Sequence, residues 1–331
     1  MIRSAECKGV IYDLARGDHN SMALFYGIDI GGSHVSAGLV TAEGRLLARA
    51  AAPLPPRPPV ETVVAVVRRL LAQMAPAGGV RRAGVGVASA VDLDGRARFA
   101  PNLGWHDVPL RGLLEDALGM DVGVFNDADC AAFAEAKVGA GRAARYLVLL
   151  TLGTGIGGGI VLDGRPYLGA GGLGAEIGHM KIVDDGPLCG CGRHGCLEAL
   201  AGGLAIRARA ARLLEERPDL AARSSLSTDF DVKAIFDAAR AGDPLAEEVV
   251  AETARYLGVA VANIINILDP EVVVLGGSIA SAGEVLWAPV REEAAQGTMG
   301  GPRPYVRVVP AVLGPDAGLV GAALLASAVY F

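Results

Sequence analysis

FYGIDIGGSHVSAGLVTAEGRLLARA (residues 25–50) consists of three short apolar runs separated by two glycine-containing turns. Apolar and small residues alternate within the runs, which is typical of β-strands with one buried face. The turns GGSH and TAEG are short enough to join neighbouring strands as hairpins. The stretch therefore predicts three consecutive strands that begin a β-sheet.

The residues after this stretch predict helices and further strands. A proline-rich segment at 53–59 ends the hairpins, and apolar residues recur at helical spacing from Val60 to about Met74. Further along we expect a buried strand at 83–91, a helix at 109–118, a strand at 122–126 and a helix at 128–137. The order βββαβα indicates a mixed sheet with helices.

The second part of the chain begins in a similar way. Two glycine-rich strands are expected at 145–153 and 155–164, joined by a polar glycine turn that resembles the first one. Helices are then predicted at 196–213, 231–241, 244–268 and 283–297, strands at 271–277 and 305–311, and a last helix from Asp316. This weak internal repeat suggests an α/β protein of two related lobes. At 331 residues the chain is long enough for two cores, with a ligand cleft expected between them.

The composition excludes several classes of function. The net charge is −6 and basic residues form no run beyond short pairs such as Arg81–Arg82, so the basic face that nucleic-acid binding requires is missing. No window approaches the roughly 18 apolar residues of a membrane span, and the first residues lack the features of a signal peptide. We therefore expect a cytoplasmic protein without nucleic-acid or membrane partners. In that reducing compartment its five cysteines favour metal or catalytic roles over structural disulfides.

Two turns have the composition of phosphate-binding loops. In DIGGSH (29–34) the glycines let backbone N–H groups approach an anion, Ser33 adds a hydroxyl, and Asp29 at a strand end could hold a hydrated Mg²⁺. TLGTGIGGG (151–159) repeats this composition with Thr154. Each turn leads into another strand and lacks Gly-Lys-Ser/Thr, which excludes both the Rossmann and the Walker A motifs.

A third glycine pair, Gly276–Gly277, lies between a predicted strand and a helix. A nucleotide-contacting turn is expected at such a position. A glycine-rich hairpin on its own is more often a simple tight turn. Three of them in one chain favour a nucleotide ligand.

Asp127 lies where a buried strand meets a helix, in FNDADCAA (125–132). Asn and Asp often cap helices at such a junction, because their side chains accept hydrogen bonds from free backbone N–H groups. The alternative role is a general base at the carboxyl edge of a sheet. Both roles are compatible if Asn126 or Asp129 caps the helix and Asp127 reacts.

The stretch GAEIGHMKIVDDGPLCGCGRHGCLEAL (174–200) combines three cysteines with His179. Three thiolates from Cys189, Cys191 and Cys196 and one imidazole nitrogen are the donors of a closed, tetrahedral structural zinc site. A disulfide between Cys189 and Cys191 would be strained, and C-x-x-C redox spacing is absent. Glu176 and Glu198 are tied closely to this loop, as solvated or capping carboxylates or as part of a site.

Together, DIGGSHVSAG, NDAD, TLGTGIGGG, EIGH and CGCGRHGCLEA resemble the ROK family of sugar kinases and repressors, in the actin-like ATPase superfamily. The resemblance runs from about Tyr26 to the last helix. It implies two ribonuclease-H-like lobes, transfer of the ATP γ-phosphoryl group to a sugar hydroxyl, and often a homodimer. The cofactors implied are ATP, Mg²⁺ and a structural Zn²⁺.

The resemblance also implies roles for individual residues. Asp127 matches the catalytic base, which would also contact the sugar. The residues that match sugar-binding groups are Asn102, Asn126, Glu176, His179 and Glu198. The residues that match ATP-contacting turns are Gly31, Gly32, Ser33, Gly153, Thr154, Gly155, Gly276 and Gly277. His179 would bind zinc through one ring nitrogen and face the sugar with the other.

The family contains both enzymes and repressors, and two features favour an enzyme. About two dozen residues precede Asp29, fewer than the DNA-binding domain of the repressors requires, and Asp127 is intact. PNLGW (101–105) resembles the glucokinase branch, which predicts the 6-hydroxyl of glucose as the acceptor. An amino sugar, an N-acyl sugar, a cyclitol or a non-catalytic sugar sensor is the alternative.

The chain departs from the family pattern in two places. Ser33–His34 replaces the usual Thr-Lys, which removes a cation near the first turn. Ala88–Ser89 replaces a pair ending in glycine, and the added side chain is expected to reshape the sugar pocket.

These assignments define the expected domains. Residues 22–125 and the helix 316–331 form a small N-terminal lobe, and residues 126–315 form a large lobe that contains the zinc loop 179–196. Residues 1–21 are expected to be a disordered extension or to follow from a misassigned start, because Met22 directly precedes the first strand.

Overall fold

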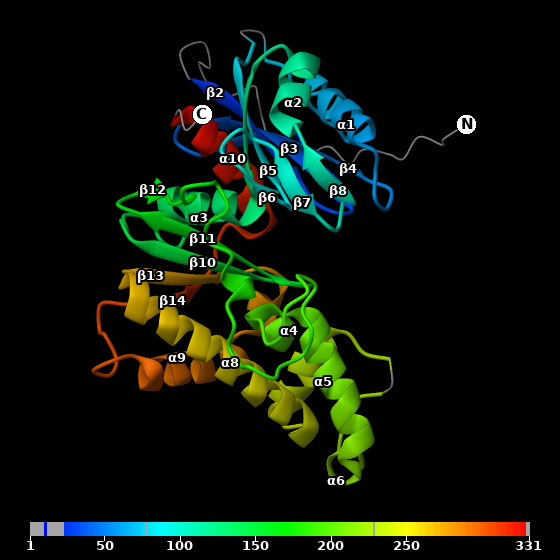
Figure 1. Cartoon of the computed structure of the whole chain (residues 1–331), viewed down its shortest axis with the longest axis vertical. Coiled ribbons are helices and arrows are strands. Elements are labelled where there is room, and N and C mark those ends of the chain that lie inside the picture. The colour runs from blue at the N-terminus through cyan, green and yellow to red at the C-terminus, as the bar shows by residue number, and fades with distance from the viewer. Residues whose placement is uncertain (1–9, 12–22, 77–78, 228, 329–331) are drawn as a thin grey trace. The chain divides into compact units, whose positions relative to one another are not determined.

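The computed structural model describes residues 10–11, 23–76, 79–227 and 229–328 (Figure 1). Contacts divide the chain into two units, Met1–Arg145 with Gly159–Ala175 and Leu313–Phe331, and Tyr146–Gly158 with Glu176–Val312. The lobe boundary expected at residue 126 lies inside the first unit. The expected extension at 1–21 lies outside the described residues, apart from the short strand β1 (Val10–Ile11).

The first unit contains a mixed six-stranded sheet with the order β1-β4-β3-β2-β5-β9. Its strands are β2 (Leu24–Ile30), β3 (His34–Thr41), β4 (Leu46–Pro53), β5 (Arg82–Val87) and β9 (Asp121–Asn126). β2, β3 and β4 pair antiparallel, with Asp29 opposite Ser36, whereas β5 and β9 run parallel to β2. The predicted hairpins and the predicted mixed sheet are confirmed.

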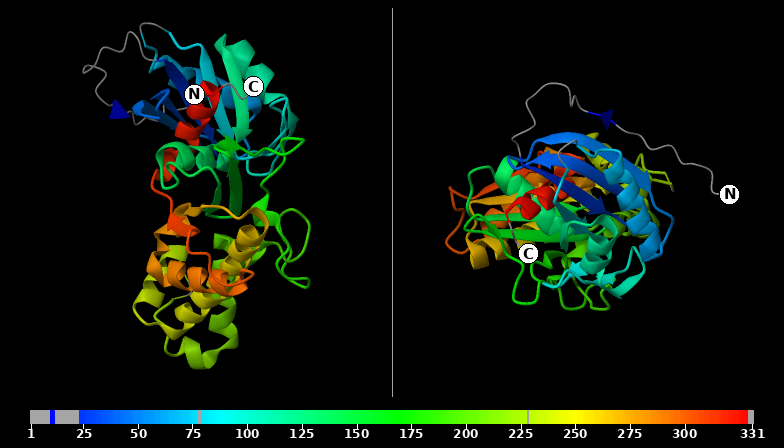
Figure 2. Two further views of the ribbon diagram at one scale, coloured as in Figure 1. Left: turned by 90° about the vertical axis from the view of Figure 1, so that its left-hand side faces the viewer. Right: turned by 90° about the horizontal axis from the view of Figure 1, so that it is seen from above.

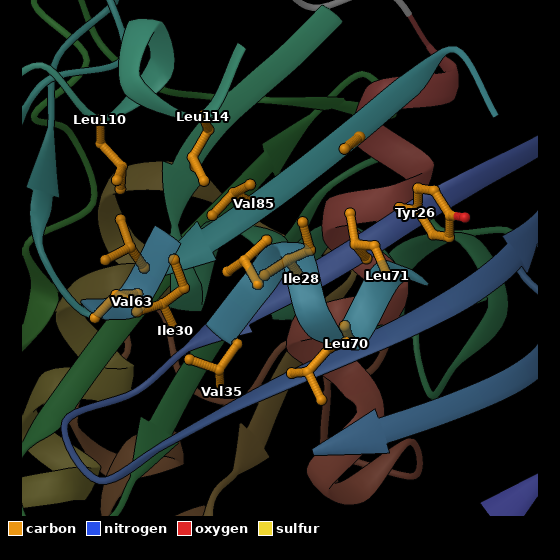
Figure 3. Packing of buried hydrophobic residues seen from close by; sticks show 14 of the residues in the cluster. Tyr26, Ile28, Ile30, Val35, Val63, Leu70, Leu71, Val85, Leu110 and Leu114 are labelled. Carbon is orange, nitrogen blue, oxygen red and sulfur yellow. The ribbon is translucent and has the colours of Figure 1, made fainter. Parts of the chain in front are cut away.

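Helices cover both faces of this sheet. They are α1 (Val60–Ala72), α2 (Leu110–Leu118), α3 (Asp127–Val138) and α10 (Ala317–Ser327). Side chains on β2 alternate between the faces, so Ile28 and Ile30 pack with Leu70 of α1 in one core (Figure 3). On the other face α10 lies directly on β2, where any side chain at Gly27 would overlap the carbonyl oxygen of Leu319. Asp29 lies on the same face as Gly27 and therefore points toward α10.

A small sheet that the sequence did not reveal lies beside β5. It has the order β6-β7-β8 and contains β6 (Ala90–Val91), β7 (Ala97–Ala100) and β8 (Trp105–Val108). The single strand predicted at 83–91 is therefore wrong, because β5 ends at Val87 and β6 belongs to another sheet. Ser89 lies at the corner between β5 and β6. It is buried, and its hydroxyl lies 2.9 Å from the carbonyl oxygen of Ala90 and 3.1 Å from that of Phe99.

The second sheet has the order β12-β11-β10-β13-β14, and the division between the units falls within β11. Its strands are β10 (Leu147–Leu152), β11 (Ile156–Leu162), β12 (Arg165–Pro166), β13 (Val272–Gly276) and β14 (Arg307–Pro310). The order along the chain matches that of β4-β3-β2-β5-β9, and β10, β13 and β14 are likewise parallel. The common strand order accounts for the predicted internal repeat.

The second unit is rich in helices. They are α4 (Leu197–Ala201), α5 (Gly203–Glu216), α6 (Pro218–Ala221), α7 (Val232–Arg240), α8 (Pro244–Leu268) and α9 (Glu284–Gly297). α8 packs along α9 (Figure 2). α8 begins as predicted, because Asp243 accepts hydrogen bonds from the N–H groups of Leu245 and Ala246.

Two predicted elements of this unit differ in extent. The helix predicted at 196–213 is interrupted at Gly202, whose backbone is extended, so it forms α4 and α5. The strand predicted at 305–311 is shorter, from Arg307 to Pro310. Within the described part of the chain, no helix combines the length and apolar character needed to cross a membrane.

Candidate active site

The glycine turn between β10 and β11 is bonded to the beginning of α5. The N–H of Gly153 donates to the carbonyl of Gly155 at 2.9 Å, which closes the turn. The N–H of Gly203 donates to the carbonyl of Gly153 at 2.9 Å, and the N–H of Leu204 donates to that of Thr154 at 3.4 Å. These two bonds join N–H groups at the beginning of α5 to carbonyl groups of the turn, and they hold the turn against α5.

A cavity of about 350 Å³ opens beside this turn, wholly within the second unit. Its lining residues are Gly153, Thr154, Gly203, Leu204, Arg207, Asp231, Val232, Lys233, Phe236, Arg240, Ser278, Ile279, Ser281 and Ala282. Apolar side chains together with three cations suit a ligand that has a flat ring and phosphates, and the volume is that of a small-molecule site. The arrangement can hold a nucleotide.

The sequence predicted the glycine turn of this cavity but missed its helical walls. Arg207 is on α5, while Lys233 and Arg240 are on α7, and they belong to no motif. Arg240 is fixed by hydrogen bonds from its Nη2 to the carbonyl of Ala282 at 3.1 Å and from its Nη1 to Asp237. Gly276 and Gly277 form the turn that leads from β13 into the short helix η3 (Ser278–Ala282), which contributes the remaining wall.

The turn between β2 and β3 in the first unit is a tight hairpin. The N–H of Gly31 donates to the carbonyl of His34 at 3.0 Å, and the carbonyl of Ser33 accepts from the N–H of Leu54 at 2.8 Å. A methyl group at Gly32 would lie 2.9 Å from the Cβ of Asn102. The turn and the predicted sugar residue Asn102 are therefore direct neighbours.

Asp29 lies beneath this turn, against the beginning of α10. Burial raises the pKa of its carboxyl to about 6, although the guanidinium of Arg49 acts in the opposite direction. Arg49 is itself held by Asp316, with Nε donating to Oδ1 at 2.7 Å. Burial makes the ionisation of this carboxyl costly. A hydrated cation beside it would stabilise the charged form, so Asp29 is suited to hold such a cation.

Asn126 and Asp127 lie at the junction of β9 and α3. Asn126 is the N-cap of α3, because its Oδ1 accepts from the N–H groups of Ala128 at 2.8 Å and Asp129 at 3.2 Å. Its Nδ2 donates to the carbonyl of Ser89 at 3.1 Å. Asp127, the first residue of α3, is half-buried, and its Oδ1 also accepts from the N–H of Ala128 at 3.0 Å. Its role as a general base stays a prediction.

The four predicted zinc ligands come together in the second unit. The ligand atoms of His179, Cys189, Cys191 and Cys196 all lie within 4.8 Å of one another. Nδ1 of His179 is 3.6 Å from Sγ of Cys189, and the Sγ atoms of Cys191 and Cys196 are 3.7 Å apart. Two thiolates about 2.3 Å from a tetrahedral zinc ion are about 3.8 Å apart, whereas a disulfide needs about 2.05 Å. The donor set and its spacing therefore fit zinc.

Glu176 and Glu198 each lie beside one of the predicted zinc ligands. Oε2 of Glu176 is 4.0 Å from Nε2 of His179, the ring nitrogen that faces away from the cysteines. Burial raises the pKa of Glu176, His179 lowers it, and Glu198 raises it further. Oε1 of Glu198 is 3.5 Å from Sγ of Cys189, while Oε2 accepts from the N–H of Ile156 at 3.0 Å.

The predicted site residues thus form two groups, one in each unit. The first unit contains Asp29, Gly31, Gly32, Ser33, Asn102, Asn126 and Asp127. The second contains Gly153, Thr154, Gly155, Glu176, His179, Cys189, Cys191, Cys196, Glu198, Gly276 and Gly277. The repeated sheet, the paired glycine turns and the nucleotide-sized cavity define a protein of the actin-like ATPase fold.

Comparison with known proteins identifies the family within this class. Residues 25–329 match the ROK family, and the chain belongs to it. The chain is 36% identical to a glucokinase of Streptomyces coelicolor over 312 residues, which cover 92% of this chain and 98% of that protein. It is 37% identical to a glucokinase of Thermotoga maritima over 305 residues, covering 90% and 95%.

A solved structure supports the same relationship. The ROK family glucokinase of Streptomyces griseus in complex with glucose and AMPPNP superposes with a TM-score of 0.79. The sequence identity is 38%, and the match covers 92% of this chain and 99% of that one.

Proposed function

We propose that this protein is an ATP-dependent hexose kinase that transfers the γ-phosphoryl group of ATP to the 6-hydroxyl of glucose. The observation that carries this proposal is the position of Asp127, which follows a parallel strand while the neighbouring Asn126 caps the helix. The glucokinases that match almost the whole chain support the choice of reaction and sugar.

Asp127 would act on the acceptor hydroxyl. Its carboxylate accepts the hydroxyl proton as the sugar oxygen bonds to the γ-phosphorus, and the bond from that phosphorus to the bridging oxygen of ADP breaks. The products are sugar phosphate, ADP and a proton on Asp127. Phosphoryl transfer otherwise depends on positioning and charge stabilisation, which we assign to the backbone N–H groups of the two glycine turns.

Two metal ions complete the proposal. Asp29 would hold hydrated Mg²⁺, which neutralises phosphate charge when bound. His179 and the three cysteines would hold Zn²⁺, which fixes the loop that contains Glu176 and Glu198. Glu176, His179 and Glu198 would then hydrogen-bond the sugar hydroxyls together with Asn102 and Asn126.

Ser89 is one of the residues at which the chain departs from the family pattern. Its side chain is buried and its hydroxyl is directed at the backbone carbonyls of Ala90 and Phe99. The serine therefore supports the corner between β5 and β6. We propose glucose over an amino sugar, an N-acyl sugar or a cyclitol because the glucokinases match almost the whole chain.

A coupled ADP-release assay over hexoses, amino sugars, N-acyl sugars and cyclitols tests the proposal. We expect glucose to give the highest kcat/KM. A higher kcat/KM for an N-acyl sugar would change the substrate. Sugar binding without ADP release would indicate a sensor, and ADP release that is independent of sugar would indicate an ATPase.

The predicted homodimer and the predicted cytoplasmic location stay predictions. Light scattering after size exclusion measures the oligomeric state.

A further inference from the structure

We propose that the metal centre positions the nucleotide-binding turn at Gly153–Gly155, through helix α4 and the carboxylate of Glu198. This rests on the proposed function, in which Glu198 contacts the sugar. It adds a second task for the same residue, a hydrogen bond that supports the turn on the ATP side. All the residues involved belong to the second unit.

Helix α4 connects the metal ligands directly to the turn. Cys196 precedes its first residue, Leu197, so one metal ligand lies at the beginning of the helix. The helix is five residues long, and Gly203 and Leu204 just beyond its end donate to the carbonyls of the turn. A shift of Cys196 would therefore be passed to the turn over little more than one helical turn.

Glu198 makes a second and shorter connection. Its Oε2 accepts the N–H of Ile156, the first residue of β11, and its Oε1 lies beside Sγ of Cys189. Any side chain at Gly155 would overlap this carboxylate. A side chain at position 155 would therefore have to displace the carboxylate of Glu198.

Arg209 of α5 fixes the other end of α4. This buried side chain donates from Nη2 to the carbonyl of Leu200 at 2.7 Å, and it also binds Glu252 and Thr253 of α8 at 3.0 and 2.9 Å. With its far end anchored, α4 has little freedom to absorb a change at Cys196. Loss of the metal should therefore displace the turn as well as the sugar-binding residues.

AMP-PNP affinity measured by calorimetry in the absence of sugar separates the two tasks. We expect Glu198→Ala to weaken AMP-PNP binding about tenfold, the usual effect of losing a hydrogen bond to a charged group. Glu198→Gln keeps an acceptor for the N–H of Ile156 and should restore the affinity to within about twofold. Glu176→Gln is the matched control, because its carboxylate lies 4.0 Å from His179 and, among the described residues, makes no hydrogen bond to the turn. It should alter glucose affinity and leave AMP-PNP affinity unchanged.

Metal removal tests the same coupling in the wild-type sequence. Chelation, followed by elemental analysis, should weaken AMP-PNP binding by a factor similar to Glu198→Ala, and adding zinc should restore it. Circular dichroism verifies that the protein is folded in each state. Unchanged AMP-PNP affinity in folded, metal-free protein, or in Glu198→Ala that retains zinc, overturns the proposal. Failure of the proposed function has a different signature, in which wild-type protein releases no ADP with any sugar while AMP-PNP binding still depends on the metal.

Discussion

The two glycine turns have the same local design but different supports. Each joins two strands, and each has a glycine against a residue assigned to the sugar, Gly32 against Asn102 and Gly155 against Glu198. The first turn lies above Asp29, a carboxyl whose pKa burial raises. The second turn is held by α5 and by Glu198, beside the metal ligands. The roles that we propose assign charge and proton transfer to the first unit and a rigid backbone for the nucleotide to the second.

Asp127→Asn should give the largest effect and tests the assignment of proton transfer to the first unit. The amide keeps the size of the side chain but cannot accept the proton, so kcat should fall by about 10²- to 10⁴-fold. Glucose affinity should stay within about threefold, because hydrogen bonding to the sugar is retained. Single-turnover kinetics and calorimetry measure the two quantities. A kcat close to that of the wild type would remove Asp127 from the mechanism.

Cys191→Ser tests the support of the second unit. Losing one of four ligands should release zinc and lower the melting temperature, because structural zinc binding contributes to folding. Glucose affinity should fall as well, since His179 and Glu198 lose their fixed positions. Elemental analysis, calorimetry and thermal denaturation provide the readouts. The exposed neighbour Arg193 gives the control variant Arg193→Gln, and zinc retention in Cys191→Ser would contradict the ligand assignment.

A pair of glycine substitutions compares the turns directly. Gly155→Ala displaces the carboxylate of Glu198, so the KM for ATP should rise about tenfold. Gly32→Ala meets the side chain of Asn102, so the KM for glucose should rise instead, by about two- to fivefold. Steady-state kinetics with each substrate varied separates the outcomes. Equal effects of the two variants on both KM values would mean that the turns are not distinct in function.

The stability of the ligand-free protein should depend on Asp29. An unfolded Asp carboxyl ionises near about 3.9, whereas in the fold burial raises the pKa of Asp29 to about 6. The folded protein therefore keeps this proton longer, and the contribution of Asp29 to stability falls as pH rises from about 4 to about 6. Asp29→Asn should remove this decline and stabilise the protein at pH 7 by about 1–3 kcal/mol.

Urea unfolding at pH 4 and pH 7, without Mg²⁺ or nucleotide, measures the effect. The exposed Asp94 gives the control variant Asp94→Asn. The same pH dependence in wild-type and Asp29→Asn protein would show that Asp29 ionises normally.

Much of the fold could be predicted because its signals are local. Alternation around Ile28 and Ile30 predicts a strand, and the helix predicted at 244–268 has the bounds of α8. The strands β6–β8 were missed because they are short and contain charged residues such as Arg98, so alternation is weak. The break at Gly202 follows from contacts with a turn some fifty residues earlier in the chain, and a helical pattern contains no sign of it.

The candidate site was predictable to a similar degree. The ligands of the metal centre come from one short segment, so their spacing indicates the site. The walls of the nucleotide cavity come from α5, α7 and η3, and residues such as Arg207 and Lys233 meet there only through folding. Likewise, the bond between Glu198 and Ile156 joins residues far apart in the sequence.

Phosphorus NMR of the reaction mixture shows directly whether the protein phosphorylates the 6-hydroxyl of glucose. Purified protein is incubated with glucose, ATP and Mg²⁺, and the spectrum is followed over time. We expect glucose 6-phosphate and ADP to appear in equal amounts, with the phosphorus signal coupled to the protons at carbon 6. Release of inorganic phosphate without a sugar phosphate, or phosphorylation at another hydroxyl, would contradict it.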